Sequence, residues 1–191
     1  MFNSYEVRIP DFHRDLVNAV CRHEVGHFYM AISCNFEASG IDVTFNGNGT
    51  YVGGAAVTII RDSNQEIEHL IRGRIKVLMA GVVSEMLDVN GEVNVAEAIK
   101  LFDTTASSDK VKIDEHLHIL RCIIEPQAKE DGEIKGVVDK LCGEIWSETI
   151  GLIQKNHNSI LEVSEGISKE IIISSKNYHF DRASIEALLL T

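Results

Sequence analysis

His23 and His27, with Glu24 between them, are the residues whose types and spacing in this sequence best suit chemistry. They form an H-E-x-x-H pattern, and residues four apart share one face of a helix, so both imidazoles can reach one metal ion. Zinc binds imidazole nitrogen and lowers the pKa of a bound water molecule, while a glutamate beside the first ligand can take that water's proton. The pattern therefore predicts a hydrolytic zinc site with His23 and His27 as ligands and Glu24 as general base.

A third protein ligand must come from elsewhere, because a catalytic zinc ion usually has three. The longer pattern with a third histidine is absent, since residues 28–33 contain none. The remaining candidates are carboxylates and one further histidine in the middle of the chain: Glu85, Asp103, Asp109, Asp114 and His116. Residue types alone do not choose among them, and a His/His/Asp set would also accept iron, cobalt or nickel in vitro.

The elements that must position these residues are mostly helices. Pro10-Asp11 is typical of a helix start, and apolar residues keep a helical period to about Ile32, which places the H-E-x-x-H pattern on a helix. A β-rich run at 41–45, the turn-prone residues 46–49 and a second run at 51–60 predict two short strands.

The capping-box pattern Ser63-Asn-Gln-Glu66 predicts the start of a long helix that ends near Leu87. Further helices are expected at 95–102, 108–126, 133–156 and 160–173, and a last one at 182–190 capped by Asp181. The predicted fold is mainly α with a small β element (α+β): a zincin-like H-E-x-x-H helix followed by a C-terminal helical bundle. We expect one domain over 1–191, with the zinc site in 1–125 and a helical tail in 126–191.

Charge and composition exclude several classes of protein. The 191 residues include 18 Lys+Arg and 29 Asp+Glu, a formal net charge of −11, which argues against binding nucleic acid or an anionic membrane. No basic and apolar leader is visible, and the apolar runs are too short to span a bilayer, so we expect a soluble, cytoplasmic protein. The four cysteines form no C-x-x-C pair, which leaves a zinc ribbon or a thioredoxin-like site unsupported.

Three segments together resemble a known family. They are His23-Glu-Val-Gly-His27, then Ile75-Lys-Val-Leu-Met-Ala-Gly-Val-Val-Ser-Glu85, then Thr104-Thr-Ala-Ser-Ser-Asp109. In this order they are similar to H-E-A-G-H, to a helix ending in G-G-R-A-A-E and to T-G-A-S-N-D in the peptidase domain of the FtsH-type ATP-dependent zinc metalloproteases. Residues 40–57 also resemble the strands that follow the motif helix in that family, and the tail matches more loosely.

The resemblance implies roles for individual residues. His23, His27 and Asp109 would bind one zinc ion per chain, Glu24 would be the general base, and Glu85 would hold an imidazole from behind. The strand that begins with Tyr51, Val52, Gly53 and Gly54 would lie beside the cleft, where a peptide or unfolded-protein substrate can pair with it through main-chain hydrogen bonds.

The chain departs from the family at Val82, Met86 and Thr105, which stand where the family has arginine, glutamate and glycine. It contains no Walker A motif, no arginine-finger region and no transmembrane helix, so a separate ATPase would have to supply any unfolding force. We therefore expect a zinc metalloendopeptidase without ATPase activity of its own. The alternative is a non-proteolytic metal-binding module that docks on a protease or ATPase partner. The sequence leaves the oligomeric state, the natural substrate and the cleavage specificity open.

Overall fold

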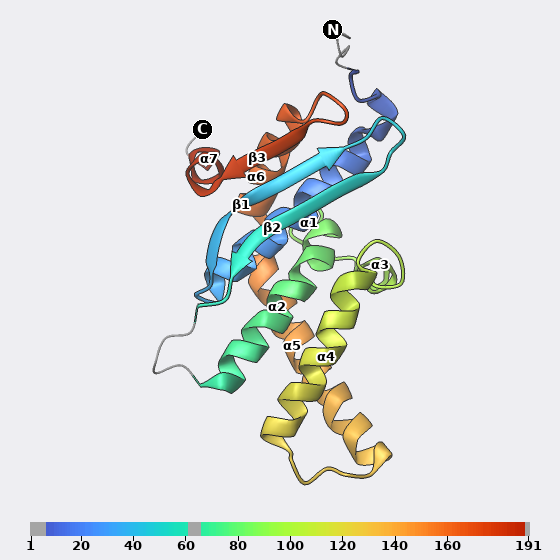
Figure 1. Ribbon diagram of the computed structural model, residues 1–191, viewed down its shortest axis with the longest axis vertical. Helices are drawn as coiled ribbons and strands as arrows, with labels where there is room; N and C mark the ends of the chain where they lie inside the picture. Colours follow the sequence, from blue (N-terminus) through green and yellow to red (C-terminus); the bar gives the residue numbers. More distant parts are fainter. Residues whose placement is uncertain (1–6, 61–65, 190–191) are drawn as a thin grey trace, which may run out of the picture.

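The computed structural model describes residues 7–60 and 66–189 and shows seven α-helices and three strands within them (Figure 1). The elements run in the order η1 (Asp11–His13), α1 (Arg14–Ser33), β1 (Glu37–Phe45), β2 (Tyr51–Thr58), α2 (Ile67–Glu85), α3 (Val95–Leu101), α4 (Ser107–Ile124), α5 (Asp131–Lys155), α6 (His157–Glu170), β3 (Asn177–Asp181) and α7 (Arg182–Ala187). The expectation of a mainly α fold with a small β element is confirmed.

The three strands form one antiparallel sheet in the order β2-β1-β3. Ile41 at the centre of β1 pairs with Ala55 of β2 and with Phe180 of β3. Buried and more exposed residues alternate along most of β1, so Ile41, Val43 and Phe45 point into the core. Because β1 occupies the middle, one long edge of β2 has no partner strand within the described residues.

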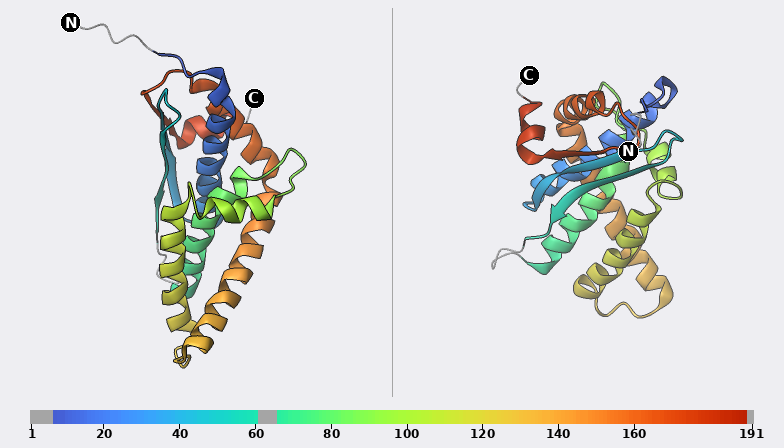
Figure 2. Two further views of the ribbon diagram at one scale, coloured as in Figure 1. Left: turned by 90° about the vertical axis from the view of Figure 1, so that its right-hand side faces the viewer. Right: turned by 45° about the horizontal axis from the view of Figure 1, so that its top comes forward.

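Helix α1 lies between the sheet and α6, as the side view in Figure 2 shows. The cluster of buried side chains that joins these layers includes Val25 and Phe28 of α1, Ile41 of β1 and Ile160 of α6. Burial on two sides fixes how α1 is rotated about its axis, because turning the helix would expose these apolar groups to water.

A second apolar cluster joins α2 to the antiparallel pair α4 and α5, which extends away from the sheet (Figure 1). Its buried members include Ile75 and Met79 of α2, Leu117 of α4 and Ile145 of α5. Helix α2 packs against α1 as well as against this pair. It therefore connects the part built around the sheet to the first turn of α4.

The structure also corrects some sequence-based boundaries. Strand β3 (Asn177–Asp181) was not predicted, although Asp181 does cap α7 by accepting a hydrogen bond from Ser184 N. The capping-box residues 63–65 lie outside the described residues, and α2 begins only at Ile67, with Glu66 at the N-cap position. Helix α6 ends at Glu170, so the segment 171–173 is not helical as expected. None of the helices in the described ranges has both the length and the apolar character needed to cross a membrane.

Candidate metal centre

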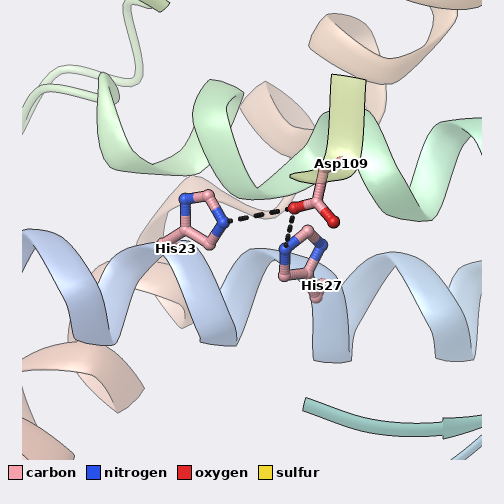
Figure 3. A group of neighbouring side chains, drawn as sticks. All are labelled: His23, His27 and Asp109. Carbon is pink, nitrogen blue, oxygen red and sulfur yellow. Dashed lines mark ion pairs between the residues drawn. The ribbon is translucent and has the colours of Figure 1, made fainter. Parts of the chain in front are cut away.

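Helix α1 directs His23 and His27 toward α2, as Figure 3 shows. The two imidazole rings lie edge to face, with centroids 4.7 Å apart and an interplanar angle of 80°. Their side chains are 14% and 12% exposed, so the pair is largely shielded from bulk water. The i, i+4 spacing thus places the two Nε2 atoms in one small volume, as the sequence predicts.

Glycines let α1 and α2 approach closely at this point. A Cβ atom added at Gly26 of α1 would lie 2.6 Å from the Ala80 carbonyl oxygen of α2. A Cβ atom added at Gly81 of α2 would lie 2.5 Å from His23 Nε2 and 2.6 Å from His27 Nε2. The missing side chain at Gly81 therefore leaves room beside both Nε2 atoms, where a shared metal ion would have to lie.

The other ring nitrogen of each histidine is held from behind by α2. His27 Nδ1 lies 2.6 Å from the Val77 carbonyl oxygen, which can only accept, so Nδ1 carries the proton and donates. His23 Nδ1 lies 3.0 Å from Glu85 Oε2 and donates to it in the same way. In the neutral imidazoles each Nε2 then presents its lone pair to the space between the helices, as metal ligation requires.

Asp109 in the first turn of α4 completes the group (Figure 3). Its Oδ2 lies 3.7 Å from His23 Nε2 and 3.4 Å from His27 Nε2, and the three ligand atoms all lie within 4.8 Å of one another. Tetrahedral zinc with bonds of about 2.0–2.1 Å separates its ligand atoms by roughly 3.3 Å, so the two distances from Asp109 to the imidazoles are close to the spacing that the ion needs. Lys112 Nζ holds the other oxygen, Oδ1, at 3.3 Å.

The other candidates for a third ligand do not join this group. Asp103 is 71% exposed and pairs with Lys110 at 2.6 Å. His116 donates from Nδ1 to a backbone carbonyl of its own helix, and Asp114 is exposed. Glu85 lies behind His23 rather than beside the two Nε2 atoms. Among the candidates left open by residue type, the geometry thus favours Asp109.

The electrostatics of the metal-free group favour a proton in the place of a cation. Burial lowers the pKa of His23, but its bonds with Asp109 and Glu85 outweigh this and raise the pKa from 6.5 to about 9. Burial raises the pKa of Asp109, yet its contacts with His23 and His27 hold that pKa well below the usual range. Binding of a metal ion would therefore have to displace a proton from this pair.

Glu24 lies on the same helix, between α1 and the edge strand β2. It is 7% exposed, and a Cβ atom added at Gly53 of β2 would lie 2.6 Å from its Oε1. Within the described ranges its carboxylate has no hydrogen-bond partner, which leaves both oxygens available to a water molecule. Glycine at 53 is therefore what admits this carboxylate beneath the strand.

A cleft of about 360 Å³ opens at the candidate metal centre, lined by His23, His27, Asp109 and Glu24. Tyr51, Val52, Gly53 and Gly54, the strand residues that the family resemblance places beside the cleft, all line it. Val52 is 70% exposed, and the outer edge of β2 carries no strand in the described part of the chain. The arrangement thus sets a free strand edge beside a buried carboxylate and a candidate metal site.

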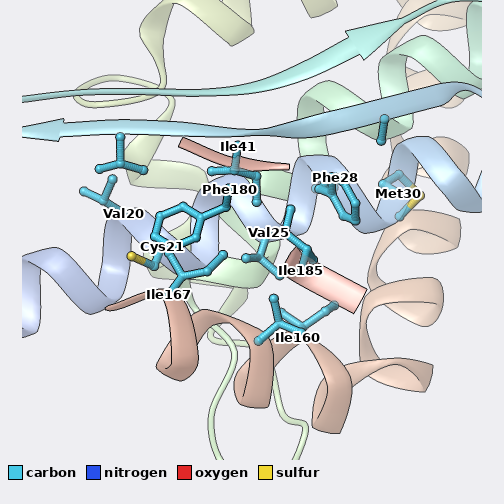
Figure 4. Packing of buried hydrophobic residues seen from close by; sticks show 14 of the residues in the cluster. Val20, Cys21, Val25, Phe28, Met30, Ile41, Ile160, Ile167, Phe180 and Ile185 are labelled. Atoms are coloured by element: carbon cyan, nitrogen blue, oxygen red, sulfur yellow. The ribbon is translucent and has the colours of Figure 1, made fainter. Parts of the chain in front are cut away.

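The opposite face of α1 is anchored in the core, as Figure 4 shows. Cys21 and Val25 of α1 pack with Ile160 and Ile167 of α6 and with Phe180 of β3. Because Cys21 precedes His23 by two residues and Val25 lies between His23 and His27, this packing directs the two histidines toward α2. Strand β3, which sequence reasoning missed, therefore contributes to positioning the site.

Sequence reasoning also missed several residues around the site. Val77 contributes through its backbone carbonyl, and backbone contacts leave no trace in residue type. Gly81, Lys112 and Arg74 line or border the cleft because of the way α2 and α4 cross, which a single helical pattern does not reveal. A glycine inside an apolar helix is the one signal that marks a close approach in advance.

No protein-family model matches the chain, and a search of curated proteins finds no match either.

Proposed function

We propose that the chain is a zinc-dependent metallopeptidase that hydrolyses peptide bonds. The observation that supports this is the convergence of His23, His27 and Asp109 beside the buried Glu24, in a cleft bordered by a free strand edge. The donor set suits zinc, and the ligand spacing, the Nδ1 partners and the space beside Gly81 all fit the ion. Zinc bound there would polarise the scissile carbonyl and acidify a water molecule.

The chain's own residues would perform the remaining work. A substrate main chain would pair with the outer edge of β2, which fixes the position of its carbonyl groups relative to α1. Glu24 would accept a proton from the attacking water and pass it to the leaving amine nitrogen. Glu85 would keep His23 oriented, and Lys112 would do the same for Asp109.

In this proposal the chain acts on accessible peptide segments, because the edge of β2 can pair only with an extended main chain. A folded substrate would need a separate ATPase to present it. Short unstructured peptides are therefore the substrates with which to test the chain alone.

The test measures metal content and peptide hydrolysis together. We expect about one zinc per chain, and cleavage of casein-derived peptides that stops in Glu24→Gln while the zinc stays bound. Glu165→Gln on the exposed face of α6 is the matched control and should leave both unchanged. Full zinc with no cleavage of any peptide would reject the peptidase and favour the metal-binding module. Cleavage that persists in Glu24→Gln would reject the role of Glu24.

A further inference from the structure

Arg74 on α2 is a cationic side chain in the cleft for which the site described above has no use. It lines the cleft together with Val77 and Leu78, three and four residues further along the same helix face. No carboxylate oxygen lies within 4.0 Å of its guanidinium anywhere in residues 7–60 and 66–189. Arg72, two residues earlier on another face, pairs with both Glu68 and Glu144.

The guanidinium of Arg74 is partly desolvated by its surroundings. Burial lowers the pKa of Arg74 below its usual value, while the charge of Asp109 acts in the opposite direction. Asp109 is already engaged by the two histidines and by Lys112, so it does not satisfy the guanidinium. A half-buried guanidinium has five donors and no acceptor, and leaving it unpaired is unfavourable.

The position of Arg74 along the cleft follows from its neighbours. Glu85 of α2 contacts His23 and Val77 contacts His27, so α2 runs antiparallel to α1 and Arg74 lies beyond His27.

The neighbours of α2 show which end of the cleft this is. The adjacent Gly73 packs against Phe36, just before β1, where Glu37 pairs with Thr58 at the end of β2. Arg74 is therefore at the Val57 end of the cleft, and a peptide lying along β2 passes it on one side of the metal centre.

We propose that Arg74 forms a carboxylate-binding subsite, so that the cleft selects peptides with an acidic group on the His27 side of the bond to be cleaved. This inference rests on the proposed function, because it takes the cleft to be the place where a peptide bond is cleaved. Guanidinium and carboxylate match in two parallel hydrogen bonds, which gives orientation as well as attraction. The carboxylate belongs either to an Asp or Glu side chain or to the free C-terminus of the peptide.

The net charge of −11 affects how acidic peptides approach this subsite. An acidic peptide is repelled by the chain at long range, so selection for it has to arise from a short-range pair inside the cleft. At about 0.15 M salt the Debye length is about 8 Å, which screens the distant charges and leaves the pairing with Arg74 to be measured.

The experiment compares one peptide in four forms, with Glu or Gln at one position on the His27 side of the cleaved bond and with a free or amidated C-terminus. The zinc-loaded protein is tested as wild type, Arg74→Gln and the matched control Arg72→Gln. Cleavage is measured as kcat/KM. Binding is measured separately by fluorescence anisotropy in a Glu24→Gln background, which needs no turnover.

We expect an acidic form to be preferred about tenfold over its neutral counterpart, in line with one charge-assisted contact at a partly exposed site. The preference should disappear in Arg74→Gln and persist in Arg72→Gln. The Glu/Gln pair and the free/amidated pair tell which carboxylate is recognised.

The two proposals fail in different ways. Cleavage with the same preference in wild type and Arg74→Gln overturns the subsite and leaves the peptidase standing. Binding with an Arg74-dependent preference, together with no cleavage by the zinc-loaded wild type, overturns the peptidase and supports the subsite. An absence of peptide binding in the Glu24→Gln background, or binding without a preference, overturns the subsite.

Discussion

Replacing Gly81 by alanine provides a severe test of the metal centre, because the added methyl group would lie where the ion is expected. The new Cβ atom would be 2.5 Å from His23 Nε2, 2.6 Å from His27 Nε2 and 2.7 Å from His27 Cε1, whereas ordinary contact begins near 3.4 Å. The rings must therefore retreat by roughly 0.9 Å, the difference between the ordinary contact distance and the shortest of the three.

The expected loss of metal affinity follows from that displacement. Metal sites tolerate changes of only about 0.2 Å in ligand distances, and mutations of groups behind the ligands already cost about 10–100-fold in affinity. A change that displaces both histidines should cost at least about 100-fold. Alanine is intrinsically more favourable than glycine in a helix by about 1 kcal/mol, so the helix itself gains while the site is lost.

Zinc affinity is best measured by competition with a chromophoric chelator, with a circular-dichroism melt of the metal-free chain beside it. Gly143→Ala on α5 is the matched control, because a Cβ atom there meets nothing within 4 Å and the change brings the same helix gain. A folded Gly81→Ala chain that binds zinc within about threefold of wild type and of this control would refute the location of the site.

Three further predictions follow from the contacts around the centre. Glu85→Gln removes the charge behind His23 but keeps an acceptor for its Nδ1–H. Zinc affinity should therefore fall about tenfold in the same competition assay, and unchanged affinity would reject the role of Glu85. Gly53→Ala would place a methyl group 2.6 Å from Glu24 Oε1. The rate of peptide cleavage should therefore fall on the order of 100-fold while the zinc content stays the same. Loss of zinc instead would contradict this geometry. In the metal-free chain the pKa of His23 is raised to about 9, so its stabilising contribution is complete below about pH 6.5 and is lost as the pH rises through 9. Urea unfolding with chelator present should show this decline in wild type and not in His23→Gln.

Part of the site could be predicted from the sequence because it depends on local geometry. The i, i+4 spacing of His23 and His27 fixes their relation on any helix, and Glu24 travels with them. Asp109 lies 82 residues beyond His27, and residue types alone did not distinguish it from Asp103 or Asp114. Its position depends on how the first turn of α4 packs against α2, which is a tertiary property.

The fold shows the same division between local and tertiary information. Long amphipathic helices were predicted closely, since many residues contribute to each period. Strand β3 has five residues, of which only Tyr178 and Phe180 are buried, and the Phe180-Asp181 pair also fits a helix start. Pairing with β1 determines its conformation, and that partner lies more than 130 residues away.

Helix α2 shows why much of the centre could not be predicted from residue types. Its side of the site consists of the Val77 carbonyl oxygen, the empty space at Gly81 and the single carboxylate of Glu85. The first two are properties of a backbone brought close to α1, and a pattern of side chains does not display them. If Gly81→Ala and Glu85→Gln weaken zinc binding as expected, α2 holds the histidines in place as firmly as α1 presents them. The H-E-x-x-H pattern is then only half of the metal centre, and the other half is the surface of α2.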